Sequence, residues 1–575
     1  MATYNFSSLS DGQSISFRPG GADVLRFDQS VISAADVRIA ASGTSTRIQV
    51  VSGQYAGKDI LLLNTTPYQL YTGNVTFASD TRLLVGDNSV NQNDNGSHTL
   101  NGTAGRDVFY GFGGNDSMNG GEGNDVFVMV TGTASSYGSD SIDGGNGFDI
   151  VDFSGARSAV NGSLAARSVS GGGVNGTGSA FVTGVDGIIG GAFNDNLRGN
   201  GAANRLEGGA GNDTVDGASG RDTLIGGAGN DTYIVYAGDV LSDSSGTDTV
   251  ISNGSWTLAS GFENLTLART DDSTGIGNSA NNVIIGNSGS NTLRGNGGND
   301  TIEGGAGGDV IEGGSGNDVL YGGDEEFGES WFDPLDNVDA INGGSGNDRM
   351  FGGTGSDGFI LSGDYGEDFI DGGAHQDLLF AGGSSALVVD LAAGTATGGG
   401  SSGRATFVNV EGAAGGRFAD WLLGNAADNL FMGRAGNDSM SGGAGNDHLM
   451  SEGGNDALTG GSGADEFRFA APAGTADADR ITDFVPGSDK IVLDGSFTSY
   501  HEEAATTFGD FAPNDDRFYA ARGATAAHDD TDRVIYDTSS GRLYYDPDGT
   551  GPAPVLIMAT LQGAPALAAT DFTVW

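Results

Sequence analysis

Residues 208–216 read GGAGNDTVD and contain the pattern that decides the fold of this chain. The pattern is Gly-Gly-x-Gly-x-Asp-x-U-x, where U is a large apolar residue, and it recurs with a nine-residue period, most clearly at 226–234, 313–321 and 442–450. Glycine permits positive φ angles and close backbone approach, so the first six residues suit a tight turn. The x-U-x triplet suits a short strand with one inward side chain. Each nonapeptide therefore predicts one turn followed by one strand.

The apolar position of the repeat predicts a narrow core. If two nonapeptides make one coil, residues eighteen apart stack and their apolar side chains form inward columns. These columns read Leu197, Leu206, Val215, Leu224, Tyr233 in one segment and Leu422, Phe431, Met440, Leu449, Leu458, Phe467 in another. Burying one such side chain contributes about 1.5–3 kcal/mol, whereas ordering each residue of the repeat costs about 1–2 kcal/mol for the backbone alone. The coils therefore need a second source of stability.

The chain is strongly acidic. Its 575 residues include 105 Gly and no Cys, and 75 Asp plus Glu against 25 Lys plus Arg give a formal net charge of −50. This charge argues against nucleic acid and anionic membranes as partners, and it opposes compaction unless cations are present. The absence of Cys excludes disulfides as stabilising links. The longest apolar run, near 553–561, is too short to span a bilayer, so no membrane insertion is expected.

A carboxylate occupies the sixth position of most repeats. Stacked turns bring these like charges together, which is unfavourable unless a cation lies between them. Ca²⁺ accepts six to eight oxygen ligands in irregular geometry, including backbone carbonyls, so Ca²⁺ is the expected cofactor. The expected metal ligands are Asp107, Asp116, Asp125, Asp149, Asp195, Asp213, Asp222, Asp231, Asp300, Asp309, Asp318, Asp348, Asp357, Asp368, Asp377, Asp420, Asp438, Asp447, Asp456 and Asp465.

Some copies leave alternatives open. The copy at 144–152 stands apart from the longer arrays, so Asp149 is either a metal ligand or the acceptor of an ordinary Asx turn. Asn replaces Asp at Asn204, Asn282, Asn291 and Asn429, mostly near the starts of arrays. These turns are expected to be caps with weaker metal binding or none. The sequence Asp546-Pro-Asp-Gly is either a further ion site or a plain turn.

The nonapeptide is similar to the calcium-binding repeat of bacterial RTX (repeats-in-toxin) proteins, and the chain resembles that family. The resemblance implies an all-β fold built as a calcium-bound parallel β-roll in several blocks. Residues 466–493 resemble the module that closes the roll in serralysin-type members, and 571–575 (DFTVW) resemble an uncleaved type I secretion signal. The N-terminus shows no pattern of a cleavable signal peptide. The resemblance therefore implies export by a type I secretion apparatus and calcium-driven folding outside the cell.

Composition and repeat phase divide the chain into segments. Short alternating runs predict a small N-terminal antiparallel β domain. The expected segments are the N-terminal β domain at 1–100, a first repeat block at 101–152, linker hairpins at 153–189, a second block at 190–234, linker hairpins at 235–276, third and fourth blocks at 277–380 with an insertion at 322–342, linker hairpins at 381–414, a fifth block at 415–468, and a C-terminal cap with the secretion signal at 469–575. The insertion is acidic and contains Trp331 and Phe332; it is expected to be a surface loop, with an extra calcium loop or a contact loop as alternatives.

No catalytic motif accompanies the repeats. The five His residues form no HExxH zinc motif, and there is no Cys nucleophile. We therefore expect a non-enzymatic protein, secreted or attached to the bacterial surface, that assembles with itself as a surface layer, filament or biofilm matrix. The first alternative is an adhesin or agglutinin that binds cell-surface polysaccharide. The second is a secreted enzyme whose site the sequence does not reveal.

Overall fold

The computed structural model describes residues 96–129, 136–324, 339–381, 383–400, 402–469, 478–493 and 509–574, together with Leu9 and strands β1 to β8. These residues form two compact units: Met1–Ser255 with Gly261–Thr266, and Trp256–Ser260 with Leu267–Trp575. Apart from the 3₁₀ turns Val174–Gly176 and Ala569–Asp571, the described residues form only strands, turns and loops. The predicted all-β fold is confirmed.

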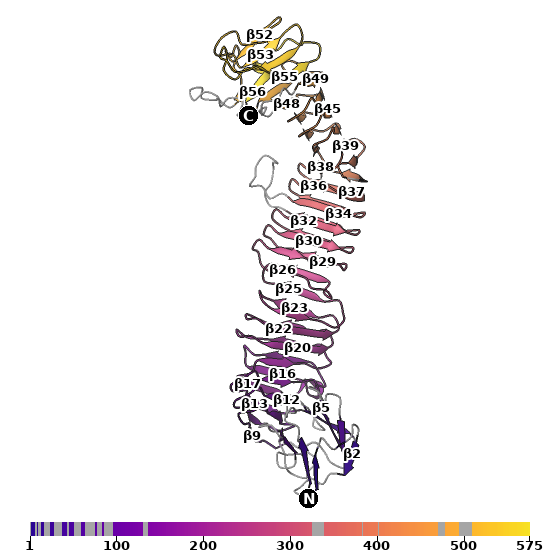
Figure 1. Ribbon diagram of the computed structural model, residues 1–575, viewed down its shortest axis with the longest axis vertical. Coiled ribbons are helices and arrows are strands. Elements are labelled where there is room, and N and C mark those ends of the chain that lie inside the picture. Colours follow the sequence, from indigo (N-terminus) through magenta and orange to yellow (C-terminus); the bar gives the residue numbers. More distant parts are fainter. Residues whose placement is uncertain are drawn as a thin grey trace. The chain divides into compact units, whose positions relative to one another are not determined.

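Unit 1 contains two ladders of strands, visible as the stacked arrows from β12 to β25 in Figure 1. The first ladder contains β8 (Leu83–Val85), β10 (Val108–Tyr110), β12 (Val126–Val128), β14 (Ile150–Asp152), β18 (Gly187–Ile189), β20 (Arg205–Ala210), β22 (Thr223–Ala228) and β24 (Val240–Ser242). The second contains, in spatial order, β9 (Thr99–Asn101), β11 (Ser117–Asn119), β13 (Ser139–Asp143), β17 (Ser179–Thr183), β16 (Ser168–Gly171), β15 (Val160–Ser163), β19 (Asn196–Arg198), β21 (Thr214–Asp216), β23 (Thr232–Val235), β25 (Thr249–Ser252) and β27 (Asn264–Leu267). Successive strands of the chain alternate between the ladders, so two strands complete one coil.

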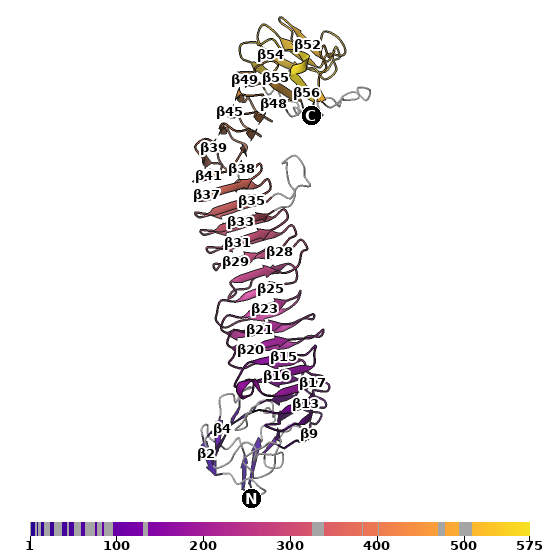
Figure 2. The same cartoon turned by 180° about the vertical axis from the view of Figure 1, so that it is seen from behind.

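Unit 2 repeats this arrangement, and Figure 2 shows its stacked strands from β29 to β37. One ladder contains β26 (Trp256–Thr257), β28 (Thr274–Ile276), β30 (Thr292–Gly297), β32 (Val310–Ser315), β34 (Ala340–Ser345), β36 (Gly358–Leu361), β38 (Leu378–Ala381), β42 (Gly412–Ala414), β44 (Leu430–Met432), β46 (His448–Met450), β48 (Glu466–Phe469), β50 (Lys490–Leu493), β56 (Phe572–Val574) and β51 (Gly509–Asp510). The other contains β29 (Val283–Ile285), β31 (Thr301–Gly305), β33 (Val319–Asp324), β35 (Arg349–Thr354), β37 (Asp364–Ala374), β41 (Ser402–Val408), β40 (Thr395–Gly398), β39 (Leu387–Asp390), β43 (Trp421–Leu423), β45 (Ser439–Ala444), β47 (Ala457–Ser462), β49 (Asp479–Ile481), β55 (Leu556–Leu561), β54 (Arg542–Tyr545), β53 (Val534–Asp537) and β52 (Phe518–Ala521).

The core follows the repeat. Leu206 lies opposite Leu224, and Val215 opposite Tyr233, so residues eighteen apart stack as the period predicts. Every residue of the two inward columns named above is at most 1% exposed. The neighbours of each inward residue point outward because side chains alternate along a strand. The core between the two ladders therefore consists of two facing columns of apolar side chains, one from each ladder.

Antiparallel strands interrupt the parallel ladders twice. β15, β16 and β17 pair antiparallel within residues 153–189, and β39, β40 and β41 do the same within 381–414. In both cases the third strand joins the preceding coil and the first strand joins the following one. The two segments thus share one topology.

The prediction of hairpins at 235–276 is wrong. β24 runs parallel to β22, and β25 runs parallel to β23, so this segment continues the roll. The physical reason is that Asp248-Thr-Val250 keeps the Asp-x-U spacing, and the ladder buries Val250 completely. This coil has only seventeen residues, but its strand still pairs in the ladder.

The ends also differ in part from the prediction. In the N-terminal segment β1 (Ala2–Asn5), β3 (Asp23–Phe27) and β7 (Val75–Phe77) pair parallel, and β2 (Gln13–Ser16) pairs parallel with β6 (Asp59–Leu63). Only β4 (Val37–Ser42), β5 (Ser45–Val50) and β6 are antiparallel neighbours, so the domain is mixed. β8 already pairs with β10, because backbone pairing requires no glycine turn. The roll therefore begins before residue 101.

The C-terminal segment forms a hairpin of β53 and β54, and β56 adds to the roll beside β50. Phe572 in β56 is fully buried. Residues 325–338 of the insertion, including Trp331 and Phe332, and Trp575 lie outside the described residues.

Candidate metal centre

The aspartates at position six are buried at the turns. All twenty that the sequence singles out are at most 3% exposed, from Asp107 to Asp465. In most of them Oδ1 accepts the backbone N–H of the position-six residue one coil earlier. The backbone N–H of Asp195 donates to Asp213 Oδ1, and the backbone N–H of Asp213 donates to Asp231 Oδ1, each over 2.7 Å. The turns are thus linked edge to edge by one carboxylate oxygen per coil.

These hydrogen bonds form two columns, one along each edge of the roll. In unit 1 the first column runs Asp107, Asp125, Asp149, Asp186 and then Asn204, Asp222, Asp239, and the second runs Asp116, Asp140 and then Asp195, Asp213, Asp231, Asp248, Glu263. In unit 2 the columns run Asn282, Asp300, Asp318, Asp348, Asp368; Asn291, Asp309, Asp339, Asp357, Asp377, Glu411; Asp420, Asp438, Asp456, Asp479; and Asn429, Asp447, Asp465, Asp489. We call these columns the carboxylate ladders.

The second oxygen of these carboxylates is what makes the ladders a candidate metal centre. Within the described part of the chain, Oδ2 is buried and accepts no hydrogen bond at Asp116, Asp125, Asp149, Asp213, Asp222, Asp231, Asp300, Asp309, Asp318, Asp348, Asp357, Asp368, Asp377, Asp438, Asp447 and Asp465. An ionised carboxylate is costly to bury without a partner, and it can only accept. Cations bound along the ladders would satisfy these atoms.

Burial also perturbs the acidity of these groups. Desolvation raises the pKa of Asp213, Asp309 and Asp438 to about 7, and that of Asp368 and Asp377 to about 8. Neighbouring ladder carboxylates add to this rise, as Asp357 does for Asp377. The metal-free ladder therefore favours the protonated acids, whereas a bound metal requires the carboxylate form.

Backbone carbonyls converge on the same place. A Cβ atom built on Gly304, at position one, would overlap both the Asp309 Oδ2 atom and the carbonyl oxygen of Gly322 in the next coil. Equivalent overlaps occur at Gly190 with Asp195 and Gly208, so glycine is required there by space. Carboxylate and carbonyl oxygens are the hard ligands that Ca²⁺ prefers. The donor set therefore fits calcium.

The first turns of the arrays are built differently. At Asp107, Asp195 and Asp420, Oδ2 accepts the N–H of the residue at position two, over 2.6–2.7 Å. The four Asn residues make the same bond through Oδ1. Each first turn thus satisfies its own side chain instead of leaving an oxygen without a partner. The three aspartates resemble the Asn caps in this respect, which the repeat pattern alone does not reveal.

Asp149 belongs to the ladder. It is fully buried, accepts the Asp125 N–H over 2.7 Å, and its turn stacks on the preceding one. The copy is therefore not isolated. It looks isolated in the sequence because the coils before and after it are long and contain no recognisable nonapeptide. The segment between Asp125 and Asp149 simply contains more residues than a regular coil.

Sequence reasoning missed several members of the ladders. They are Asp140, Asp186, Asp239, Asp248, Glu263, Asp339, Glu411, Asp479 and Asp489. Six of them, Asp140, Asp186, Asp248, Asp339, Asp479 and Asp489, stand two residues before a buried apolar residue. A search for Asp-x-U alone would have found these six, since the glycines are not essential to the ladder bond.

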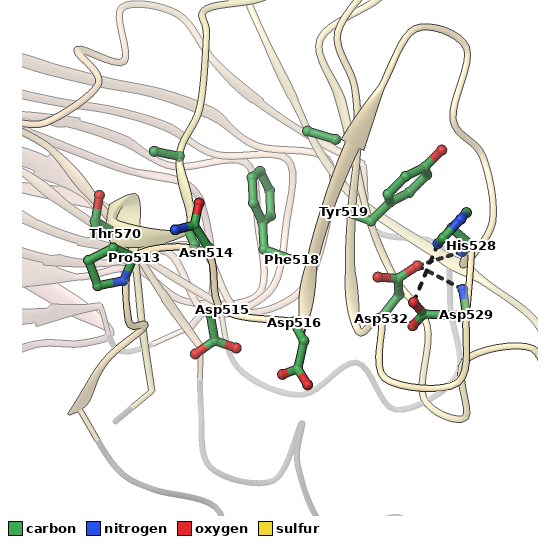
Figure 3. Close-up of a pocket in the computed structure, with 13 residues that line it drawn as sticks. Pro513, Asn514, Asp515, Asp516, Phe518, Tyr519, His528, Asp529, Asp532 and Thr570 are labelled. Carbon is green, nitrogen blue, oxygen red and sulfur yellow. Dashed lines mark hydrogen bonds and ion pairs between the residues drawn. The ribbon is translucent and has the colours of Figure 1, made fainter.

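A separate hollow of about 570 Å³ lies in the C-terminal segment and is lined by residues of 513–520, 528–532 and 568–570 (Figure 3). His528, Asp529 and Asp532 each offer a ligand atom within 4.8 Å of the others, and the Tyr519 ring stacks on His528. Asp532 Oδ2, however, accepts the backbone N–H groups of His528 and Asp529. Its own loop therefore satisfies this carboxylate, unlike the ladder aspartates.

Comparison with known families decides what the repeats are. A family model described as the RTX calcium-binding nonapeptide repeat matches residues 94–127, 183–215, 198–233, 276–311, 303–325, 337–359, 360–385, 414–449 and 432–467. The chain belongs to the RTX repeat proteins. The RTX repeats bind calcium, which confirms the cofactor expected from the sequence, and they are characteristic of secreted proteins.

Among solved structures, this RTX chain is similar to the AlgE6R3 subunit of the Azotobacter vinelandii mannuronan C5-epimerase. The two are 30% identical over 27% of this chain and 78% of that chain, with a TM-score of 0.18. No curated protein matches the chain. In the part of the chain that the structure describes, no helix has the length and apolar character needed to cross a membrane.

Proposed function

We propose that this RTX protein is a calcium-dependent structural component of the bacterial surface, which assembles with itself outside the cell and has no catalytic role. The observation that carries the proposal is the extent of the roll. Carboxylate ladders and strand ladders run through most of the described residues of both units, and each coil is supported by its neighbours. A body built in this way suits a scaffold.

The outer faces of the strand ladders supply surfaces for lateral packing. Val283 and Ile285 on β29, Tyr321 on β33 and Val408 on β41 are each between 38% and 47% exposed. Exposed apolar side chains on the face of a strand ladder favour protein contacts, and calcium neutralises the acids that would otherwise keep copies apart.

Electron microscopy and light scattering of the purified protein test this proposal. We expect sheets or fibres at millimolar calcium and dispersed chains in EGTA. A double substitution, Val283→Ser with Ile285→Ser, should weaken assembly without moving the calcium midpoint of folding. A calcium-loaded protein that stays monomeric at all concentrations would refute the structural role.

A second candidate function, adhesion to polysaccharide, is favoured by an aromatic and cationic patch on β33, β35 and β37. The Tyr321 and Phe351 rings stack at 5.0 Å, and the Arg349 guanidinium lies over Phe351 and Phe369 at 5.6 and 5.0 Å. Hollows of about 620 and 450 Å³ flank the patch, the first beside Tyr321 and the second beside Arg349 and Arg404. Aromatic rings and arginines are groups that hold sugar rings and carboxylates.

The adhesin proposal predicts binding to acidic polysaccharide. Arg404→Ala should lower the affinity several-fold in a pull-down or by calorimetry, whereas Arg417→Ala, at another exposed arginine, should not. Equal affinities of both variants and the natural chain would speak against this patch.

A further inference from the structure

A third carboxylate enters the ladder where the second array ends. The turn at 243–248 reads DSSGTD and stacks on the turn at 226–231, which reads GGAGND. The bridge between Ala228 and Ser245 fixes the register, so Asp243 stands at position one. The stacked turn before it has Gly226 at this position.

The three carboxylates of this turn pair lie close together. Asp231, Asp243 and Asp248 each place one oxygen within 4.8 Å of the others. Asp231 is 1% exposed and Asp248 is fully buried, and among the described residues the Oδ2 atom of each has no hydrogen-bond partner. Two buried oxygens that lack partners and a third carboxylate beside them form a donor set that a cation would satisfy.

The protein fixes the third carboxylate in place. Asp243 Oδ1 accepts the Tyr233 hydroxyl over 2.8 Å and the Gly227 N–H over 3.1 Å. Tyr233 is itself fully buried, and its hydroxyl oxygen accepts the Gly226 N–H over 2.7 Å. Asp243 is therefore held in place before any ion binds, which lowers the cost of binding.

We propose that Asp231, Asp243 and Asp248 form a three-carboxylate calcium site with higher affinity than the other ladder positions. Calcium affinity rises with the charge of the ligands and the rigidity of the site. The site therefore fills first, and the coils around 226–252 gain order at a lower calcium concentration than the rest of the roll. The inference requires that the repeats bind calcium, but it does not require that the protein assembles.

Asp243→Asn tests the site, because asparagine keeps the oxygen that accepts the two hydrogen bonds and removes only the charge. Competition with a calcium chelator should show, in the natural chain, one ion bound at least tenfold more tightly than the others. Asp243→Asn should lose this tight class and keep the others, while Asp271→Asn, which removes an exposed acid, should keep both.

Two further measurements separate the outcomes. Tyr233→Phe removes the hydroxyl that orients Asp243, and it should weaken the tight ion several-fold while leaving all three carboxylates in place. Hydrogen exchange at low calcium should protect 226–252 first in the natural chain and lose this order in Asp243→Asn. A tight class that survives Asp243→Asn, or that Asp271→Asn removes equally, would overturn the site and leave the structural role untouched.

Discussion

At the scale of single residues, the position-six aspartate has two separate tasks. Oδ1 accepts a backbone N–H from the preceding coil, as Asp213 does from Asp195, and Oδ2 is left for a cation. The hydrogen bond fixes the carboxylate in position, and the buried second oxygen makes the turn unfavourable until a cation arrives. One side chain thereby links coil stacking to calcium binding.

The raised pKa values predict that, without metal, the folded state is more stable at low pH than at high pH. Asp213 and Asp438 have pKa values raised from 3.8 to about 7 by burial. An acid with a higher pKa in the folded state stabilises the fold below its unfolded pKa, and this contribution is lost as the pH rises through the folded value. The metal-free protein should therefore retain more sheet signal at pH 5 than at pH 8 by circular dichroism. With calcium the order should reverse, because the metal binds the ionised form. A metal-free protein at least as stable at pH 8 as at pH 5 would contradict this account.

Glycine at position one should be required for calcium binding. In Gly304→Ala the new Cβ would overlap Asp309 Oδ2 and the Gly322 carbonyl, so the turn must shift. Overpacking of this kind costs about 1–3 kcal/mol, and the calcium midpoint should rise accordingly in a titration followed by circular dichroism. Gly254→Ala is the matched control, because its Cβ would meet no atom within 4 Å. A Gly304→Ala midpoint equal to the control's would show that the cradle is not needed.

At the scale of the elements, the coil is the unit that the sequence predicts best. The spacing of Leu206, Val215 and Leu224 gave the strands, their inward residues and the eighteen-residue stacking, because each nonapeptide carries its own turn and core position. Turns without the Gly-Gly pair, such as the one that contains Asp140, were missed because little more than the Asp-x-U spacing remains. The parallel course of 235–276 was also missed, since local alternation does not distinguish a hairpin from a continued ladder.

Core truncation should act locally. Leu449→Ala removes one fully buried inward side chain, and such changes cost about 2–5 kcal/mol. Because each coil contacts only its neighbours, amide hydrogen exchange should accelerate around 414–469 and stay unchanged around 190–235. Uniform acceleration along the whole chain would contradict a nearest-neighbour roll.

Asp149 and Asp222 should be equivalent. Both are buried, both accept the N–H of the preceding ladder residue, and both donate to a following acid. Asp149→Ala and Asp222→Ala should therefore raise the calcium midpoint of their surroundings by similar factors, as read from local hydrogen exchange during a titration. An Asp149→Ala variant that behaves like the natural chain would restore the view of Asp149 as an ordinary turn acid.

At the scale of the whole molecule, the net charge of −50 and the thin core both oppose folding without metal. The strand ladders and the inward columns of apolar residues do not outweigh this opposition, because one inward side chain per nonapeptide contributes too little to the free energy of folding. We therefore expect calcium binding and folding to be one process in this chain, as is usual where the binding site exists only in the folded state.

The most direct test is far-ultraviolet circular dichroism of the metal-stripped protein at pH 7.5 during calcium titration. We expect a largely unfolded spectrum without metal, a cooperative gain of sheet signal as calcium is added, and no such gain with the same concentration of magnesium. A compact, sheet-rich and cooperatively melting protein in metal-free buffer would contradict the account.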